Sequence, residues 1–418
     1  MADTFFVGHT GDTSQIAALS IVTPVFLVMS VVSAVFSVGA NAGISSSLGA
    51  GNKDRARQIA SFSLYTSIGI VCILAIILAV FMRPFLYLIG AKESNIGFCV
   101  DYLFWVFIVG CIPFVSSHLL AQSLLAEGEA RLAAIGSALG GILNIILDPI
   151  FIFTLDMGIE GAAIATCISN YAALLFFIIV YIIKRKNLVF SLNPKYWSGR
   201  NGVCSSVLLI GIPSGFALCL TVVCDFFRMH YISALGTETD LAAFGVVQKI
   251  GNLTIQLSVG MAQGIRPLVA YNYSSGNRAR MRALMRGSAV AVLSFVFVCV
   301  ALLELFPRQA MSIFLTDTAT IALGAVFMRQ WVICQIGLCS TDLINAFFQA
   351  MGKWKQAMFI TFFNKGLLLI PVMLLLIKLI GMSGVIWVQP ITENVTLLVA
   401  LTMFLISLSK IKEINREA

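Results

Sequence analysis

The sequence predicts an all-α integral membrane protein made of two six-helix lobes around a central cavity. Three observations support this class. Hydrophobic residues make up 59% of the 418 residues, charged residues only 11%, and the mean hydropathy is +0.97, whereas soluble domains contain about 25% charged residues. Apolar runs of about 20 residues, the length of a membrane-spanning helix, recur along the whole chain. The chain also matches itself when it is shifted by 225 positions.

The self-match defines the two halves. Without a gap, Gly39 falls on Gly264, Asn52 on Asn277, and Arg55 on Arg280. A second block matches at nearly the same shift, where Gly158-x-x-Gly161 corresponds to Gly381-x-x-Gly384. An apolar chain with such a repeat is typical of a secondary transporter, whose site lies between the halves near the bilayer midplane.

The helices are predicted in chain order from the apolar runs. These runs lie near 16–38, 58–81, 98–124, 132–155, 159–183, 203–234, 242–272, 286–306, 319–349, 356–380 and 384–408. A stub at 1–8 precedes them. Residues 203–234 begin the second half, and their counterpart would start about 22 positions before Met1 (203 − 225 = −22). We therefore expect a twelve-helix design with a shortened first helix. The N-terminal residues lack the basic and small-residue features of a signal peptide.

Prolines and glycines add detail to these helices. Prolines within or near the ends of spans predict bends; they are Pro113, Pro149, Pro213, Pro267, Pro371 and Pro390. Small residues four apart predict close helix packing; the pairs are Gly39/Gly43, Gly136/Gly140 and Gly260/Gly264.

Alternate loops are basic, which predicts the orientation of the chain. The basic loops contain Arg55, Arg131, Arg185, Arg280 and Lys353, and the intervening loops contain acids such as Glu93, Asp156 and Glu238. The basic set is expected to be cytoplasmic. An even number of helices per half makes the repeat parallel. The net charge of +8 then reflects topology and does not indicate nucleic-acid binding.

The predicted organisation follows from these loops. It comprises an N-terminal lobe at 1–183, a cytoplasmic linker at 184–202, a C-terminal lobe at 203–409 and a cytoplasmic tail at 410–418.

Several functions are excluded by missing motifs. The chain contains no GxxxxGK[ST], HExxH or GxSxG motif, so neither ATP hydrolysis nor an enzymatic activity is expected. Its ten cysteines have no CxxC or zinc spacing and are expected to pack as small apolar residues. No metal and no cofactor are expected. Because the ATP-binding motif is missing, the energy for transport is expected to come from an ion gradient.

The first half places acids inside apolar segments, where each charge is costly and requires a reason. Asn144 and Asp148 are four residues apart in Gly140-Gly-Ile-Leu-Asn-Ile-Ile-Leu-Asp-Pro149, so they share a helix face. A carboxylate with an amide one turn away can hold a proton or help to enclose a small cation. The alternative is a cap at the helix break before Pro149. Asp3 is either a solvated terminal acid or, by the repeat, an acid inside the first helix.

The second half contains charges of both signs. Asp225 and Arg228 are three apart on one face and are expected to form an ion pair. Lys249, Arg266, Arg329 and Lys365 lie in or beside spans, and Asp342 and Glu393 add two acids. These residues either form structural ion pairs between helices or line a substrate cavity. For Asp342, which follows Ser340-Thr341 and precedes Asn345, we favour a cavity face.

The chain resembles the multidrug and toxic compound extrusion (MATE) family over essentially its whole length. The resemblance rests on Asp3-Thr-Phe-Phe-Val-Gly8, Gly49-Ala-Gly-Asn52, Asn144-x3-Asp148-Pro149, Gly158-x-x-Gly-Ala-Ala-Ile-Ala-Thr166, Gly260-x3-Gly264-x2-Pro267 and Gln349-Ala-x-Gly352. It implies a V-shaped cavity between two six-helix lobes and the export of amphipathic, often cationic, drugs in exchange for H⁺ or Na⁺.

The resemblance also implies site residues. A first-lobe coupling site for the cation or proton would comprise Asp3, Asn144, Asp148 and Thr166. The second-lobe acids match less well, and the candidates for the substrate cavity are Asp225, Arg228, Asp342 and Glu393. The shortened first helix departs from the family pattern. We expect weak transport by the 418 residues alone and stronger transport after about 22 apolar residues are added at the N-terminus.

The predicted protein is a monomeric, multi-pass antiporter of the bacterial inner membrane, in contact with lipid and with small-molecule substrates. An alternative is a flippase of lipid-linked saccharides from the same superfamily, because a pyrophosphate-bearing substrate requires a basic cavity such as Arg228, Lys249, Arg329 and Lys365 would provide.

Overall fold

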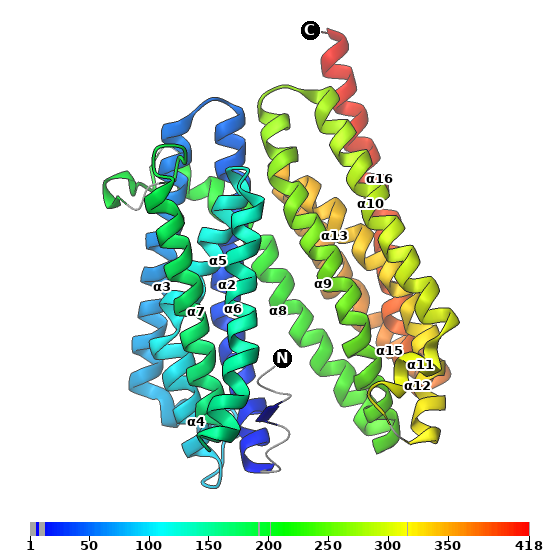
Figure 1. Ribbon diagram of the computed structural model, residues 1–418. Coiled ribbons are helices and arrows are strands. Elements are labelled where there is room, and N and C mark those ends of the chain that lie inside the picture. The colour runs from blue at the N-terminus through cyan, green and yellow to red at the C-terminus, as the bar shows by residue number, and fades with distance from the viewer. Residues whose placement is uncertain (1–5, 8–12, 191–192, 201, 316, 418) are drawn as a thin grey trace. The chain divides into compact units, whose positions relative to one another are not determined.

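The computed structural model describes residues 6–7, 13–190, 193–200, 202–315 and 317–417, and within them the chain is helical, with no strand (Figure 1). The predicted all-α membrane fold is confirmed. The chain divides into two compact units, Met1–Gly215 (unit 1) and Phe216–Ala418 (unit 2). The division falls inside one helix, α8 (Val203–Leu235), which begins in unit 1 and ends in unit 2. The lobe boundaries expected from the sequence remain predictions.

Unit 1 consists of helices that pack around two clusters of buried apolar residues. Its elements before α8 are α2 (Thr13–Gly49), α3 (Lys53–Leu88), α4 (Ile96–Leu103), the π-helical η1 (Phe104–Val109), α5 (Cys111–Ala126), α6 (Ala130–Pro149), the π-helical η2 (Ile150–Thr154), α7 (Gly158–Ile183) and the short η3 (Pro194–Tyr196). Helix α2 packs on α3 and α5, and α6 packs on α7.

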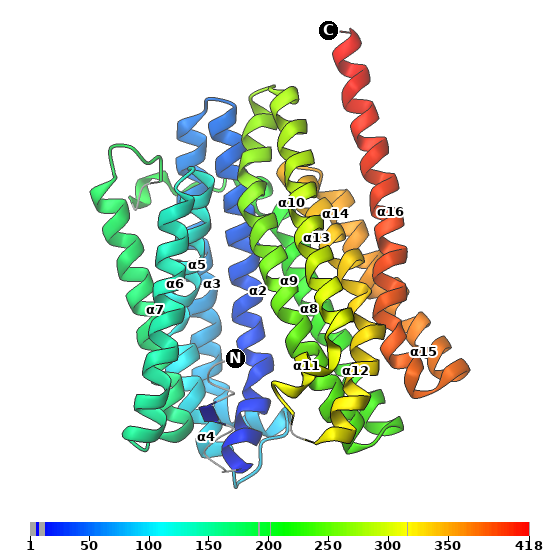
Figure 2. The same ribbon diagram turned by 45° about the vertical axis from the view of Figure 1, so that its right-hand side comes forward.

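Unit 2 repeats this plan with its own apolar clusters. After α8 come α9 (Glu238–Ser274), α10 (Arg278–Leu305), α11 (Pro307–Ser312), α12 (Thr318–Val332), α13 (Cys334–Ala350), α14 (Trp354–Thr361), the π-helical η4 (Phe362–Leu368), α15 (Leu369–Ile380) and α16 (Met382–Glu417). Helix α9 packs on α10 and α13, and α13 packs on α16 (Figure 2).

The repeat is visible in local structure as well as in sequence. Asn52 accepts a hydrogen bond from the Arg55 backbone N–H over 2.9 Å and begins α3. Its counterpart Asn277 accepts from the Arg280 backbone N–H over 3.1 Å and begins α10. An Asn side chain satisfies a backbone donor that the first helical turn leaves free. The same sequence pair, Gly-Asn, therefore starts the same helix in both halves.

The membrane-spanning segments agree closely with the predicted runs. In the described part of the chain, nine helices are long and apolar enough to cross a membrane, and Ile96–Val109 with Cys111–Ala126 passes the same test as a pair bent by 47°. The eleventh predicted run, 242–272, lies in α9, which is 37 residues long but more polar than the others. The predicted stub at 1–8 lies outside the described residues, apart from Phe6 and Val7.

The predicted small-residue contacts are confirmed in unit 1 and wrong for one pair in unit 2. A Cβ atom at Gly39 would meet the Val207 carbonyl oxygen at 2.3 Å, and one at Gly136 would meet the Phe177 ring at 2.4 Å. These glycines therefore allow close helix contacts. At Gly260 and Gly264 a Cβ atom would meet nothing within 4 Å in the described chain. Those two glycines leave a hollow on α9 instead of a packed contact.

In unit 1, the loop between α5 and α6 is bonded to the segment that follows α7. Lys184 forms an ion pair with Glu129, and the Glu127 carboxylate accepts hydrogen bonds from the backbone N–H groups of Val189 and Phe190. Burial raises the pKa of Glu127 to about 7. The first residues of the predicted linker are thus held against the loop between α5 and α6.

Candidate functional site

Three of the four residues predicted for the first-lobe site lie together in unit 1, on α6 and α7. Asp148 lies in the last turn of α6, and its side chain is fully buried (0% exposed). The Asn144 Nδ2 atom donates to Asp148 Oδ1 over 3.1 Å and to Thr166 Oγ1 over 3.1 Å. One amide nitrogen therefore joins the carboxylate of α6 to the hydroxyl of α7. Asn144, Asp148 and Thr166 meet as predicted, whereas Asp3 lies outside the described residues.

The local sequence explains why the helix changes at this point. Pro149 has no backbone N–H, so the α-helical hydrogen-bond pattern cannot continue through it. The chain passes into the π-helical turn η2 directly afterwards, and π-helical turns are frequent at functional sites. Asp148 is thus placed where the backbone pattern is interrupted, inside the membrane-spanning segment Ala130–Thr154.

Two glycines bring α7 against this turn. Gly158 has a φ of 54°, and at Gly161 a Cβ atom would meet the Phe151 carbonyl oxygen at 2.7 Å. Only a residue without a side chain allows so close an approach of α7 to η2. Gln15 of α2 adds a further contact, because its Oε1 accepts from the Ile159 backbone N–H over 2.9 Å. The Gly158-x-x-Gly161 motif therefore sets the position of Thr166 on α7.

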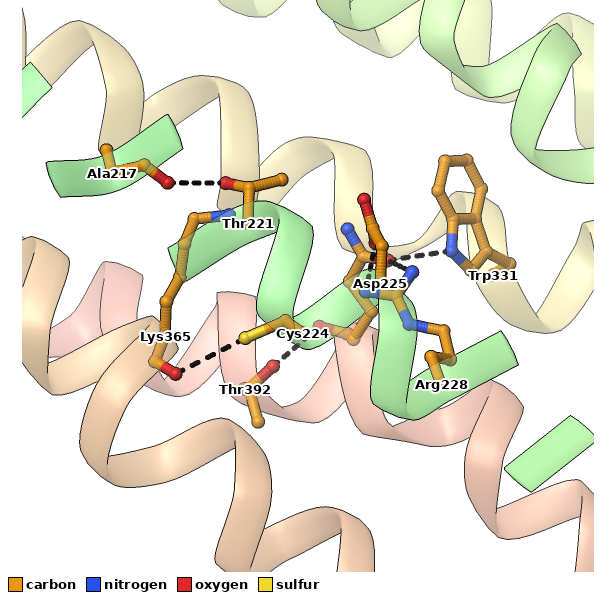
Figure 3. A network of polar contacts seen from close by, with 9 residues as sticks. Ala217, Thr221, Cys224, Asp225, Arg228, Trp331, Lys365 and Thr392 are labelled. Atoms are coloured by element: carbon orange, nitrogen blue, oxygen red, sulfur yellow. Dashed lines mark hydrogen bonds and ion pairs between the residues drawn. The ribbon is translucent and has the colours of Figure 1, made fainter. Parts of the chain in front are cut away.

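Unit 2 contains a larger polar network, shown in Figure 3. Arg228 of α8 forms the predicted ion pair with Asp225, with 3.1 Å between Nη2 and Oδ1. The Arg228 Nη1 atom also donates to Gln389 Oε1 over 2.7 Å, and Trp331 Nε1 donates to the same oxygen over 3.1 Å. The Arg228 side chain is 5% exposed and that of Asp225 is 46% exposed. The network therefore ties α8, α12 and α16 together around a buried cation.

A second set of polar contacts connects η4 with α8 and α16. Asn364 of η4 donates to Glu393 Oε2 over 2.7 Å, and both residues are buried. The Cys224 thiol donates to the Lys365 carbonyl oxygen over 3.3 Å (Figure 3). Because a π-helical turn leaves some carbonyl groups without an intrahelical partner, Lys365 can accept this bond from α8. The Asn364–Lys365 pair thus connects α8 and α16 through a helix irregularity.

Asp342, the remaining predicted residue of the second lobe, lies on α13 and is half-buried. Lys365, Glu393 and Arg266 act on it electrostatically. Arg266 is 7% exposed, and its Nε and Nη1 atoms have no hydrogen-bond partner among the described residues. Asp225, Asp342 and Glu393 thus share the helices of unit 2 with the bases Arg228, Arg266 and Lys365.

The sequence did not single out several members of these clusters. Gln15, Trp331, Asn364 and Gln389 were missed because each reaches its partner across helices. A signal existed for Asn364-Lys365, which interrupts an otherwise apolar run, and for Gln389, which precedes Pro390.

Comparisons with known proteins agree with this architecture. The family model MatE matches residues 1–150 and 213–375. The multidrug export protein MepA of Staphylococcus aureus (strain MRSA252) is 30% identical over 406 residues, which cover 95% of this chain and 87% of that protein. MepA of Staphylococcus saprophyticus is 28% identical over 404 residues, with the same coverage.

Solved structures share the fold. An outward-facing multidrug resistance MATE family transporter of the MOP superfamily superposes with a TM-score of 0.92 at 23% identity, covering 99% of this chain and 92% of that one. A mutant of the Vibrio cholerae MATE transporter VcmN superposes with a TM-score of 0.89 at 20% identity, covering 98% and 92%.

These comparisons confirm the multi-pass membrane fold, and the bacterial relatives fit the predicted inner-membrane location. Members of this family are transporters of small molecules and not enzymes. The chain belongs to the MatE family and is a MATE-type efflux transporter.

Proposed function

We propose that this protein is a secondary antiporter that exports amphipathic, often cationic, organic compounds in exchange for H⁺ or Na⁺, with Asn144, Asp148 and Thr166 as the coupling site. The observation that carries the proposal is the full burial of Asp148 inside a membrane-spanning helix. A carboxylate at such a depth is costly and marks an ion or proton pathway. The names of the relatives, multidrug export proteins, support the substrate class.

The geometry suggests how the site responds to its ion. When Asp148 is ionised, its Oδ1 accepts a hydrogen bond from Asn144 Nδ2, with 3.1 Å between the two atoms. Protonation of that oxygen makes it a donor and a weaker acceptor, and a bound cation competes for the same lone pairs. The bond from Asn144 is thereby weakened, which affects the bond of the same amide nitrogen to Thr166 on α7. Loading of the site is thereby coupled to the contact between α6 and α7.

Inside-out vesicles test the proposal and identify the ion. A pH gradient and a sodium gradient are imposed separately, and uptake of a cationic fluorescent dye is followed. One of the two gradients should drive uptake above the level of vesicles without the protein. Failure of both gradients to drive uptake would contradict antiport.

We further propose that a single chain is the functional transporter, because it contains both halves of the repeat.

A second candidate is transport of lipid-linked saccharides, which the buried cations of unit 2 favour. Arg228 and Arg266 are 4% and 7% exposed, and a guanidinium binds pyrophosphate oxygens in a bidentate manner. Proteoliposomes containing a fluorescent lipid-linked saccharide distinguish the two functions. Translocation that Arg266→Gln abolishes would favour the flippase, and absence of translocation together with dye export would exclude it.

A further inference from the structure

Lys365 is a cation inside a membrane-spanning segment of unit 2. It lies near the middle of the segment Trp354–Ile380, in the π-helical turn η4. Its side chain is partly buried, and its ammonium group forms no ion pair and no hydrogen bond with any described residue. A charge at such a depth is costly and requires a partner or a water-filled cavity. Contacts within unit 2 therefore do not explain this ammonium group.

The acids of the neighbouring helices are not its direct partners. Glu393 Oε2 accepts the hydrogen bond of Asn364 Nδ2 over 2.7 Å. Asp342 experiences the charge of Lys365, but the two residues do not reach ion-pair distance. These acids offset the charge of Lys365 from a distance and leave its three N–H donors free.

The backbone of η4 fixes where the ammonium group lies. The Cys224 thiol donates to the Lys365 carbonyl oxygen over 3.3 Å, which holds η4 against α8. From this contact the Lys365 side chain extends toward Thr221 (Figure 3). Thr221 and Asp225 are four residues apart and share a face of α8. Lys365 and Asp225 both act electrostatically on the Cys224 thiol, so an ammonium and a carboxylate lie along the same stretch of α8.

The carboxylate of this pair of charges is also accessible. Asp225 Oδ1 pairs with Arg228 over 3.1 Å, and the Asp225 side chain is 46% exposed, whereas that of Arg228 is 5% exposed. The Asp225 Oδ2 atom has no hydrogen-bond partner among the described residues. Asp225 is thus held in place by a buried base and keeps one oxygen for a ligand.

An aromatic surface lies on the same two elements. Phe216 of α8 stacks on Phe362 of η4, with 6.5 Å between the ring centroids and 21° between the ring planes. Phe362 is exposed and precedes Lys365 by three residues, so it lies about one turn away. The stretch of α8 and η4 therefore combines a cation, an anion and apolar rings.

We infer that this stretch binds zwitterionic substrates, with the Lys365 ammonium on the substrate carboxylate and Asp225 on its cationic group. A carboxylate accepts strong, charge-assisted hydrogen bonds from an ammonium group, and the rings suit the apolar part of an amphipathic compound. The inference rests on the proposed export function, because the ligand is taken to be a transported compound. It extends that function from cations to molecules that also carry a carboxylate.

Two dyes that differ in one charge test the inference. Rhodamine B carries a cation and a carboxylate, and its ethyl ester keeps the cation alone. Their Kd values for the purified chain in detergent are measured by fluorescence anisotropy, without any gradient. The variants are Lys365→Gln, the conservative Lys365→Arg, and Lys378→Gln, which alters an exposed lysine of the same membrane-spanning segment as a matched control.

Lys365→Gln should raise the Kd of rhodamine B about tenfold, the effect expected for loss of one charge-assisted hydrogen bond, and should leave the Kd of the ester unchanged. Lys365→Arg should retain the affinity for rhodamine B, and Lys378→Gln should change neither value. Asp225→Asn, measured well below its Tm, should raise the Kd of both dyes because both carry the cation. An unchanged Kd in Asp225→Asn would overturn the role of Asp225.

A purely structural role of Lys365 would give a different pattern. If Lys365 only balanced Asp342 and Glu393, Lys365→Gln would weaken binding of both dyes alike, and this result would overturn the inference. Failure of the natural chain to bind rhodamine B would overturn it as well. A chain that binds rhodamine B through Lys365 but exports no dye from vesicles in either gradient would refute the antiport and retain the binding site.

Discussion

The Asn144 amide nitrogen lies 3.1 Å from Asp148 Oδ1 and equally far from Thr166 Oγ1. This arrangement makes Asn144 the link between the carboxylate of α6 and the hydroxyl of α7. Five testable expectations are derived below, from this site, the α6–α7 contact, the polar network in unit 2, the Glu127 loop and the basic loops.

The small size of Gly136 is required for the α6–α7 contact. A Cβ atom there would meet the Phe177 ring at 2.4 Å, so Gly136→Val should destabilise the protein by about 1–3 kcal/mol through overpacking. Gly260→Val is the matched control, because its Cβ position is open. Melting temperatures in detergent measure both variants, and an equal effect of the two substitutions would contradict the packing described for α6 and α7.

Removing Asp225 from its ion pair with Arg228 should cost more stability than removing Arg228. Asp225→Asn leaves a buried guanidinium without its counter-charge, which should cost about 1–3 kcal/mol after allowance for the 46% exposure of Asp225. Arg228→Met leaves only a half-exposed carboxylate and should cost less. The Tm values of the two variants and of the double variant test this order. A larger loss for Arg228→Met than for Asp225→Asn would show that the buried charge is not the costly partner.

Stability should depend on pH through Glu127. Burial raises its pKa from 4.5 to about 7 in the folded protein, so between these values the folded state binds more protons than the unfolded state. Stability therefore falls as the pH rises from about 4.5 to 7. The Val189 and Phe190 N–H groups donate to different oxygens of Glu127, so Glu127→Gln keeps an oxygen acceptor for one of them and removes the titration. Its Tm should change less than that of the natural chain across this range, and identical pH profiles would contradict the assignment.

The orientation follows from the basic loops. A cysteine in place of the exposed Glu93, in a background without native cysteines, should react with an impermeant maleimide added to intact cells. A cysteine in place of Arg185 should react only after the membrane is opened. The opposite pattern would reverse the predicted topology.

The sequence was sufficient to predict the fold because composition, helix length and the repeat all point to the same architecture. Ten predicted spans are confirmed by length and apolarity, and the eleventh run, α9, is a helix with more polar residues. The π-helical turns η1, η2 and η4 were not predicted, since only bends at the prolines could be inferred. Gly260/Gly264 was wrongly predicted as a packed pair because spacing shows that helices can approach closely, but not that a partner is present.

The candidate site was predictable to the extent that its contacts are local. Asn144 and Asp148 meet because they are one turn apart, and Asp225 pairs with Arg228 for the same reason. Thr166 came only from the resemblance to the MATE family. Gln389 and Trp331, which complete the surroundings of Arg228, are separated from it by many residues. Such partners depend on how helices pack, which spacing in one sequence does not reveal.

The most direct test of the account is gradient-driven export by Asp148→Asn, which keeps the shape of the side chain and removes its charge. Dye uptake into inside-out vesicles is compared at equal protein levels for the natural chain, for Asp148→Asn and for Asp54→Asn, which alters an exposed acid. The account predicts that Asp148→Asn lowers uptake by about tenfold or more, as expected for loss of an essential buried ionisable group, and that Asp54→Asn retains it. Undiminished, gradient-dependent uptake by Asp148→Asn would show that Asp148 is not the coupling residue.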